Sequence, residues 1–194
     1  MQNIEFMLEE LFKQNKGYLH AKDIQQKRML QYELQALHAS GRVTRLRRGL
    51  YRHEDLATLD HWQEVSIMYP KAVLCMYSAA SFYELTTYMP PAVHLAIGNK
   101  AKMKTEKFPP VQLYYWPDKY YMQHIVIIND VKIYSIERTV CDLIRLESQS
   151  GFDVVKEVCQ NYLRRQDKNI NLLMTTAREI DVYDKVTKLF EILI

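Results

Sequence analysis

One segment decides how the first quarter of the chain folds: Gly41-Arg-Val-Thr-Arg-Leu-Arg-Arg-Gly-Leu-Tyr-Arg52. Apolar side chains recur in it at Val43, Leu46, Leu50 and Tyr51, and the sequence Arg-Arg-Gly interrupts them at positions 47–49. Two short apolar runs on either side of a glycine-containing break are typical of two strands joined by a turn. The segment therefore predicts a β-hairpin.

Three helices are expected before this hairpin. Apolar residues at positions 4, 7, 8, 11 and 12 share one face of a first helix, which Gly17 ends. A short second helix is expected around residues 20–26. The spacing of Leu30, Leu34 and Leu37 predicts a third helix that stops at Ser40-Gly41. Three helices followed by a hairpin form a winged helix-turn-helix, which we expect to occupy residues 1–55.

The first quarter is also the basic part of the chain. Residues 1–53 hold ten Lys and Arg against five Asp and Glu, whereas residues 54–194 hold sixteen against eighteen. Residues 42–52 contain five arginines and no acidic residue. Such a cluster predicts binding to a polyanion, because uncompensated like charges repel one another until an anion neutralises them.

This combination predicts contacts with double-stranded DNA. A helix fits the major groove, and a basic hairpin beside it reaches phosphates or the minor groove. Gln31 and Gln35 are the best candidates for reading bases, because a Gln amide can pair with adenine through two hydrogen bonds. The hairpin arginines would mainly hold phosphates. The candidate DNA-binding residues are Lys27, Arg28, Gln31, Tyr32, Gln35, Arg42, Arg45, Arg47, Arg48 and Arg52.

Residues 56–194 predict a second, α+β domain. Alternating patterns at 93–97 and 111–116, an apolar run at 72–76, and Asn129-Asp130 between two further apolar runs predict a small, mostly antiparallel sheet. From Ser135, an expected N-cap, apolar residues at helical spacing predict a helical C-terminal tail. Arg138 and Asp142 lie four residues apart in its first helix, which favours an ion pair between them.

Three parts of the sequence resemble the AbiE-type antitoxins, bacterial abortive-infection regulators that are paired with a nucleotidyltransferase toxin. The first part is Gly17-Tyr-Leu-His-Ala-Lys-Asp-Ile24 followed by Leu34-Gln-Ala-Leu37 and the hairpin segment. The second is Tyr77-Ser-Ala-Ala-Ser-Phe-Tyr-Glu-Leu85 with Val93-His-Leu-Ala-Ile97, and the third is Ser135-Ile-Glu-Arg-Thr-Val-Cys-Asp-Leu-Ile-Arg145.

The resemblance implies the antitoxin of a type IV toxin-antitoxin system that acts in phage defence. Such a regulator represses its own operon by binding inverted repeats upstream. It counteracts the toxin without forming a stable complex with it.

Two other functions remain open. Pro117-Asp118 followed by Asp130-Val131-Lys132 fits the spacing of a Mg²⁺-dependent nuclease, in which two carboxylates hold the ion and the lysine assists a water molecule.

A protein-interaction module without DNA binding is the other alternative, in which the arginines bind an acidic partner. Aromatic residues allow sheet packing, a protein interface or base stacking. They are Tyr114, Tyr115, Trp116, Tyr120, Tyr121 and Tyr134.

Beyond these alternatives we expect a non-enzymatic protein with no catalytic residue, metal site, cofactor or small-molecule substrate. The sequence contains no GxxxxGK[ST] loop and no HExxH motif, and its three cysteines lie far apart. Glu9 and Glu10 fall where a secretory signal needs apolar residues. The uncharged stretches are shorter than the roughly 20 residues of a membrane helix. A cytoplasmic location without a membrane partner is therefore expected.

Overall fold

The protein consists of two compact units. A computed structural model describes residues 2–193, with side chains at all of them except positions 2, 3, 149 and 150. The first unit ends at Met68 and the second begins at Tyr69. We call them unit 1 and unit 2. This division lies later in the chain than the boundary at 55/56 expected from the sequence.

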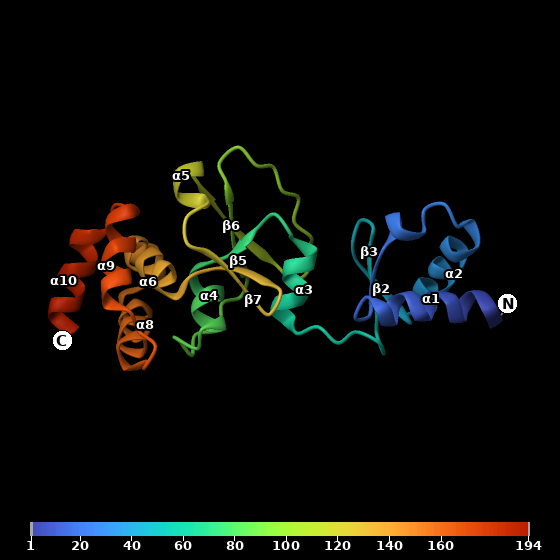
Figure 1. The fold of residues 1–194 in the computed structure, drawn as a ribbon, viewed down its shortest axis with the longest axis horizontal. Coiled ribbons are helices and arrows are strands. Elements are labelled where there is room, and N and C mark those ends of the chain that lie inside the picture. Colours follow the sequence, from blue (N-terminus) through green and yellow to red (C-terminus); the bar gives the residue numbers. More distant parts are fainter. Residues whose placement is uncertain (1, 194) are drawn as a thin grey trace. The chain divides into compact units, whose positions relative to one another are not determined.

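Unit 1 combines helices with a three-stranded antiparallel sheet in the order β1-β3-β2 (Figure 1). The 3-10 helix η1 is a single turn that stands where the short second helix was expected. Strand β1 was not predicted, because three residues are too few to show alternation. The elements are α1 (Gln2–Gln14), β1 (Tyr18–His20), η1 (Ala21–Ile24), α2 (Arg28–Ala39), β2 (Val43–Arg47), β3 (Leu50–His53) and α3 (His61–Met68).

The expected apolar faces form the core of unit 1. Leu8 and Phe12 of α1 are fully buried, together with the three leucines of α2, Val43 and Tyr51. The turn after α1 requires glycine at position 17, whose φ is +88° and whose N–H donates to the Phe12 carbonyl at 2.7 Å. A Cβ atom there would lie 2.3 Å from Cα of Ala57. Gly17 thus ends the helix, as predicted, and permits a close approach of two backbone segments.

The five strands of unit 2 form one sheet in the order β6-β5-β4-β8-β7. The pairs β5/β6 and β4/β8 are parallel, and the pairs β4/β5 and β7/β8 are antiparallel. The expectation of a mostly antiparallel sheet was therefore wrong, because the long connection at residues 99–110 lets β6 return parallel to β5. The strands are β4 (Val73–Leu74), β5 (Val93–Gly98), β6 (Val111–Trp116), β7 (Ile125–Ile128) and β8 (Val131–Tyr134).

The predicted hairpin between β7 and β8 is confirmed. Its two turn residues, Asn129 and Asp130, both have positive φ, at 49° and 64°. A two-residue turn with this backbone matches the right-handed twist of the flanking strands, and Asn and Asp tolerate it better than most residues.

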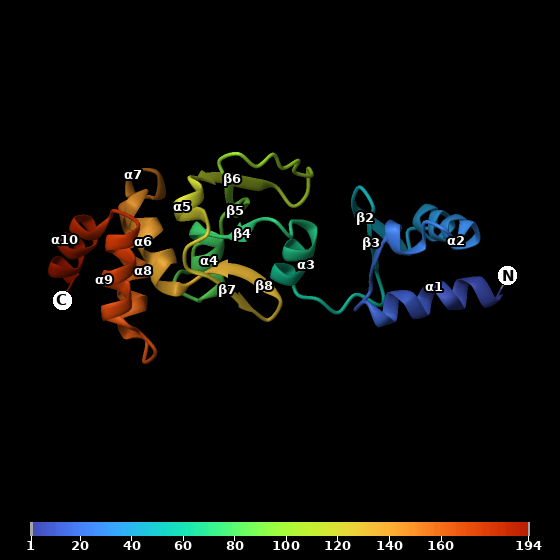
Figure 2. The same ribbon diagram turned by 45° about the horizontal axis from the view of Figure 1, so that its top comes forward.

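Helices gather beside the sheet of unit 2, and α6, α8, α9 and α10 lie together in both ribbon views (Figures 1 and 2). The Ser135 hydroxyl caps α6 by accepting from the Arg138 N–H at 3.2 Å, which confirms the predicted N-cap. Arg138 also forms the predicted ion pair with Asp142, at 2.8 Å, and both side chains are buried. The helices are α4 (Met76–Phe82), α5 (Asp118–Tyr121), α6 (Ile136–Arg145), α7 (Glu147–Ser150), α8 (Phe152–Arg164), α9 (Ile170–Glu179) and α10 (Tyr183–Leu193).

Across residues 2–193, none of the helices combines the length and the apolar character needed to cross a membrane.

Candidate nucleic-acid interface

Helix α2 presents a polar face opposite its buried leucines. Leu30, Leu34 and Leu37 point into the core with exposed fractions of 2–4%. At 3.6 residues per turn, positions 28, 32 and 35 then fall on the outward side. Arg28 and Gln35 are exposed, and Tyr32 is 77% exposed. The structure thus brings three of the predicted base-facing residues onto one accessible helix face.

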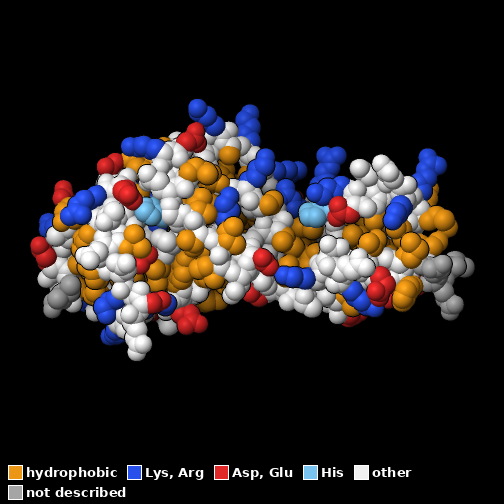
Figure 3. All heavy atoms as spheres, viewed as in Figure 1, with side chains coloured by type: hydrophobic (Ala, Val, Ile, Leu, Met, Phe, Trp, Pro, Cys, Tyr) orange, Lys and Arg blue, Asp and Glu red, His pale blue; other side chains and the backbone are white. Residues whose placement is uncertain are grey.

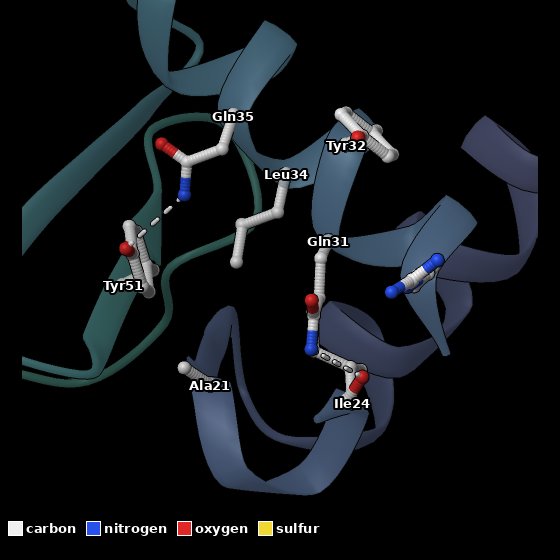
Figure 4. A pocket seen from close by; sticks show the side chains of 8 residues that line it. Ala21, Ile24, Gln31, Tyr32, Leu34, Gln35 and Tyr51 are labelled. Atoms are coloured by element: carbon white, nitrogen blue, oxygen red, sulfur yellow. Dashed lines mark hydrogen bonds between the residues drawn. The ribbon is translucent and has the colours of Figure 1, made fainter. Parts of the chain in front are cut away.

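This face borders a pocket of about 490 Å³ between η1, α2 and β3 (Figure 4). Ala21 and Ile24 contribute from η1, and Tyr51 contributes from β3. Four predicted DNA-binding residues line the pocket from α2: Arg28, Gln31, Tyr32 and Gln35.

The two glutamines differ in what their amides already bind. The Gln31 Nε2 donates to the Gln25 carbonyl at 2.7 Å and to the Ile24 carbonyl at 3.3 Å. Figure 4 shows this amide directed at η1, so Gln31 fixes the turn that precedes α2. The Gln35 Nε2 has one long hydrogen bond of 3.5 Å to the Tyr51 hydroxyl. Gln35 is therefore the glutamine that remains able to contact a ligand.

The five hairpin arginines fall into two groups. The first group consists of Arg42, Arg47 and Arg52, whose side chains bind other residues of unit 1. Arg42 forms ion pairs with Glu5 and Glu9 of α1, the second at 2.7 Å. Arg52 forms ion pairs with Glu54 and Glu64, both at 3.1 Å. The Nη1 of Arg47 donates to the Met68 carbonyl.

The second group consists of Arg45 and Arg48. Both side chains are exposed, and neither has an ion-pair or hydrogen-bond partner among the described residues. The register of β2 against β3 shifts between Arg45 and Arg47, just before the turn.

The pKa values reflect the first group's ion pairs. The hydrogen bonds that Arg42 donates to Glu5 and Glu9 raise the pKa of its guanidinium. Partial burial lowers the pKa of Arg52, but the hydrogen bonds and charges of Glu64 and Glu54 outweigh this effect and raise it overall. Two of the five arginines are thus neutralised by acids outside the segment. The expectation that the five arginines have no acidic neighbour was therefore wrong for Arg42 and Arg52.

Two further cations lie at the start of α2. Lys27 occupies the position before the helix, Arg28 is its first residue, and both side chains are exposed. Neither side chain has an ion-pair or hydrogen-bond partner within the described part of the chain. The exposed cations of unit 1 that the described residues leave without a side-chain partner therefore include Lys27, Arg28, Arg45 and Arg48.

The sequence reasoning missed the acids that pair with the arginines. Glu5 and Glu9 stand four residues apart, so they share a face of α1 and meet Arg42 together. Their spacing was visible in the sequence. Their proximity to Arg42 was not. Glu64 of α3 is 17% exposed and also accepts a hydrogen bond from the Tyr18 hydroxyl at 2.7 Å.

The three residues of the nuclease alternative lie in unit 2. Asp118 is the first residue of α5, Lys132 lies on β8, and both line a pocket of about 450 Å³. Asp130 belongs to the β7–β8 turn and is not among the residues that line this pocket. Within the described residues, no group of three or more His, Cys, Asp or Glu is placed to hold a metal ion.

The aromatic residues of unit 2 mostly pack against its core. Trp116 and Tyr134 are buried, and Tyr114, Tyr120 and Tyr121 are partly buried against the same cluster. Tyr115 differs from them, with 53% of its surface exposed.

No protein-family model matches this chain, and a search of curated proteins finds no match either.

Proposed function

We propose that unit 1 is a winged helix-turn-helix that binds double-stranded DNA. The observation that carries the proposal is the exposed face of α2 with Arg28, Tyr32 and Gln35, in the same unit as the exposed hairpin arginines Arg45 and Arg48, which have no ion-pair partner among the described residues. The element order and the antiparallel sheet support this class, with η1 and α2 as the helix pair and β2–β3 as the wing.

In this proposal α2 lies in the major groove. Gln35 and Arg28 contact base edges, since an amide can pair with adenine and a guanidinium with guanine. Lys27, Arg45 and Arg48 hold phosphates, which supplies affinity without sequence selectivity. Arg42 and Arg52 do not contact DNA in this proposal. Their ion pairs link the hairpin to α1 and α3 and stabilise its position within unit 1.

We further propose that the protein is a non-catalytic transcriptional repressor and the antitoxin of an AbiE-like type IV system. This part is supported by the sequence resemblance alone. The DNA would be inverted repeats upstream of its own operon. The functional partner would be a nucleotidyltransferase toxin, counteracted without a stable complex.

Fluorescence anisotropy with the protein's own upstream DNA and a scrambled duplex of equal length tests the DNA-binding proposal. We expect tighter binding to the upstream duplex. Gln35→Ala should reduce the difference between the two duplexes, whereas Arg48→Ala should weaken both equally. Glu33→Gln, in the same helix, serves as a matched control.

Absence of binding to either duplex at low salt would refute this proposal and favour a protein-interaction module. The exposed apolar residues Met29 (65%) and Tyr32 (77%) on α2 would suit that function. The antitoxin role has a separate test, which is growth of cells that express this protein together with the toxin. Continued growth arrest would refute the antitoxin role even where DNA binding holds.

A further inference from the structure

A lysine-rich loop joins the parallel strands β5 and β6 of unit 2. It spans residues 99–110 and carries Lys100, Lys102, Lys104 and Lys107, all exposed. None of the four has an ion-pair or hydrogen-bond partner among the described residues. Figure 3, drawn in the view of Figure 1, shows Lys and Arg side chains gathered over this part of unit 2. The loop is therefore a second basic surface, separate in sequence from the hairpin arginines.

Further lysines extend this surface at the start of the loop. Lys71 and Lys132 line the 450 Å³ pocket together with Gly98 and Ala101. Asp118 is the acidic residue that lines this pocket. Within the loop, Glu106 is partly buried, and its N–H donates to the Tyr69 hydroxyl at 3.1 Å. The loop and the pocket lining together hold six lysines and two acids, a balance of charge that attracts polyanions.

Exposed aromatic side chains stand at both ends of the loop. Phe108, near its end, is 83% exposed. The start of the loop is fixed to the end of β6 by a hydrogen bond of 2.8 Å from the Asn99 N–H to the Trp116 carbonyl. Tyr115, 53% exposed, is the residue before Trp116 on this strand. Because β6 is an edge strand, one side of it has no neighbouring strand.

We propose that the lysine loop and the exposed aromatic residues beside it bind single-stranded nucleic acid. Lys100, Lys102, Lys104 and Lys107 contact successive phosphates, and Phe108 and Tyr115 stack on bases. Lysines that follow the backbone, combined with aromatic platforms for bases, are how proteins bind single strands without sequence preference.

The aromatic residues favour a single strand over a duplex. In a duplex the faces of the bases are stacked on one another. An aromatic ring can stack on a base only after that base has been unstacked from its neighbour, which costs free energy. The basic residues lie on an irregular loop and not on a helix or β-ribbon that fits a groove. This site does not depend on duplex binding by α2.

Fluorescence anisotropy of the full chain with labelled dT15 and rU15 tests the proposal, and the two probes distinguish DNA from RNA. The variant carries Lys→Gln at positions 100, 102, 104 and 107. Loss of four lysine–phosphate contacts should reduce the magnitude of the slope of log K against log salt by about 2.8. Tyr115→Ala and Phe108→Ala should each weaken binding by about 5- to 150-fold.

A matched control makes the result specific. Lys→Gln at the exposed positions 156, 168, 185 and 188, all within the C-terminal helical region, changes the net charge equally and should leave affinity for both probes unchanged. Equal losses in the loop variant and the lysine control, or wild-type binding by the loop variant, would overturn the proposal. So would loop substitutions that weaken only binding to a duplex.

Discussion

The two groups of hairpin arginines should respond differently to substitution. We predict that Arg45→Ala with Arg48→Ala weakens duplex binding and flattens its salt dependence, whereas Arg42→Ala leaves the salt dependence unchanged. The three arginines share the same hairpin and the same charge. They differ in that Arg42 already pairs with Glu5 and Glu9, so a phosphate that binds it has to displace these carboxylates.

The size of the effect follows from the four uncompensated cations that we assign to DNA contacts, Lys27, Arg28, Arg45 and Arg48. If each neutralises one phosphate, log K falls against log salt with a slope of about −3.6, so affinity drops about 150-fold between 50 and 200 mM salt. The double variant keeps two cations, and its slope should be about −1.8. Over the same range its affinity should drop only about 12-fold.

Fluorescence anisotropy at several salt concentrations measures these slopes. Arg42→Ala loses two partly exposed ion pairs, which contribute at most about 1 kcal/mol each to folding, so the variant should remain folded. A slope that flattens as much in Arg42→Ala as in the double variant would refute the division of the arginines. An unchanged slope in the double variant would show that the hairpin does not contact phosphates.

Three further predictions concern folding. Burial lowers the pKa of His94 to about 4, below its unfolded value, so the unfolded state binds the proton first as pH falls. The free energy of unfolding of unit 2 should therefore drop by about 2 to 3 kcal/mol between pH 6.5 and 4, as measured by urea denaturation. Asp142→Ala should cost about 3 to 5 kcal/mol, because it leaves the buried Arg138 guanidinium uncompensated. Gly17→Ala should lower the stability of unit 1 by more than about 2 kcal/mol in thermal unfolding, because its Cβ would meet the backbone of Ala57.

Each of these has a matched control. His94→Asn keeps a hydrogen-bonding partner for the Tyr114 hydroxyl and should remove this pH dependence of the unfolding free energy. A variant with the wild-type dependence on pH would assign it to another group. Arg138→Met with Asp142→Leu should recover most of the stability lost in Asp142→Ala, and no recovery would contradict the role of the unpaired charge. Gly41→Ala has a similar φ of +77° but meets no atom within 4 Å, so it should cost only about 1 kcal/mol. Equal losses at both glycines would mean that contact with Ala57 is unimportant.

Local patterns were enough to predict most helices and both hairpins. The spacing of Leu30, Leu34 and Leu37 predicted α2, because a helix places such residues on one face. Asn129-Asp130 predicted the β7–β8 turn through its tolerance of positive φ. The same patterns could not predict that β5 and β6 are parallel, since alternation is identical in both pairings and only the path of residues 99–110 decides between them.

The candidate site was predicted only in part. The outward position of Arg28, Tyr32 and Gln35 follows from helical geometry, and the structure agrees with it. The inward hydrogen bonds of Gln31 depend on the path of η1, which the sequence did not reveal. The lysine loop does not show in the total charge of residues 54–194, because acids elsewhere in that region offset its lysines.

The sequence by itself determined the two-part organisation, the concentration of charge in the first quarter and the helix face that carries the polar residues. Each of these depends on composition or on periodicity within a few turns of chain. Only the tertiary structure decided which arginines are free. Glu5 and Glu9 lie 37 and 33 residues from Arg42 along the chain, and they neutralise it because folding brings α1 against the start of β2. Charge compensation depends on distance in space, which a local pattern does not encode.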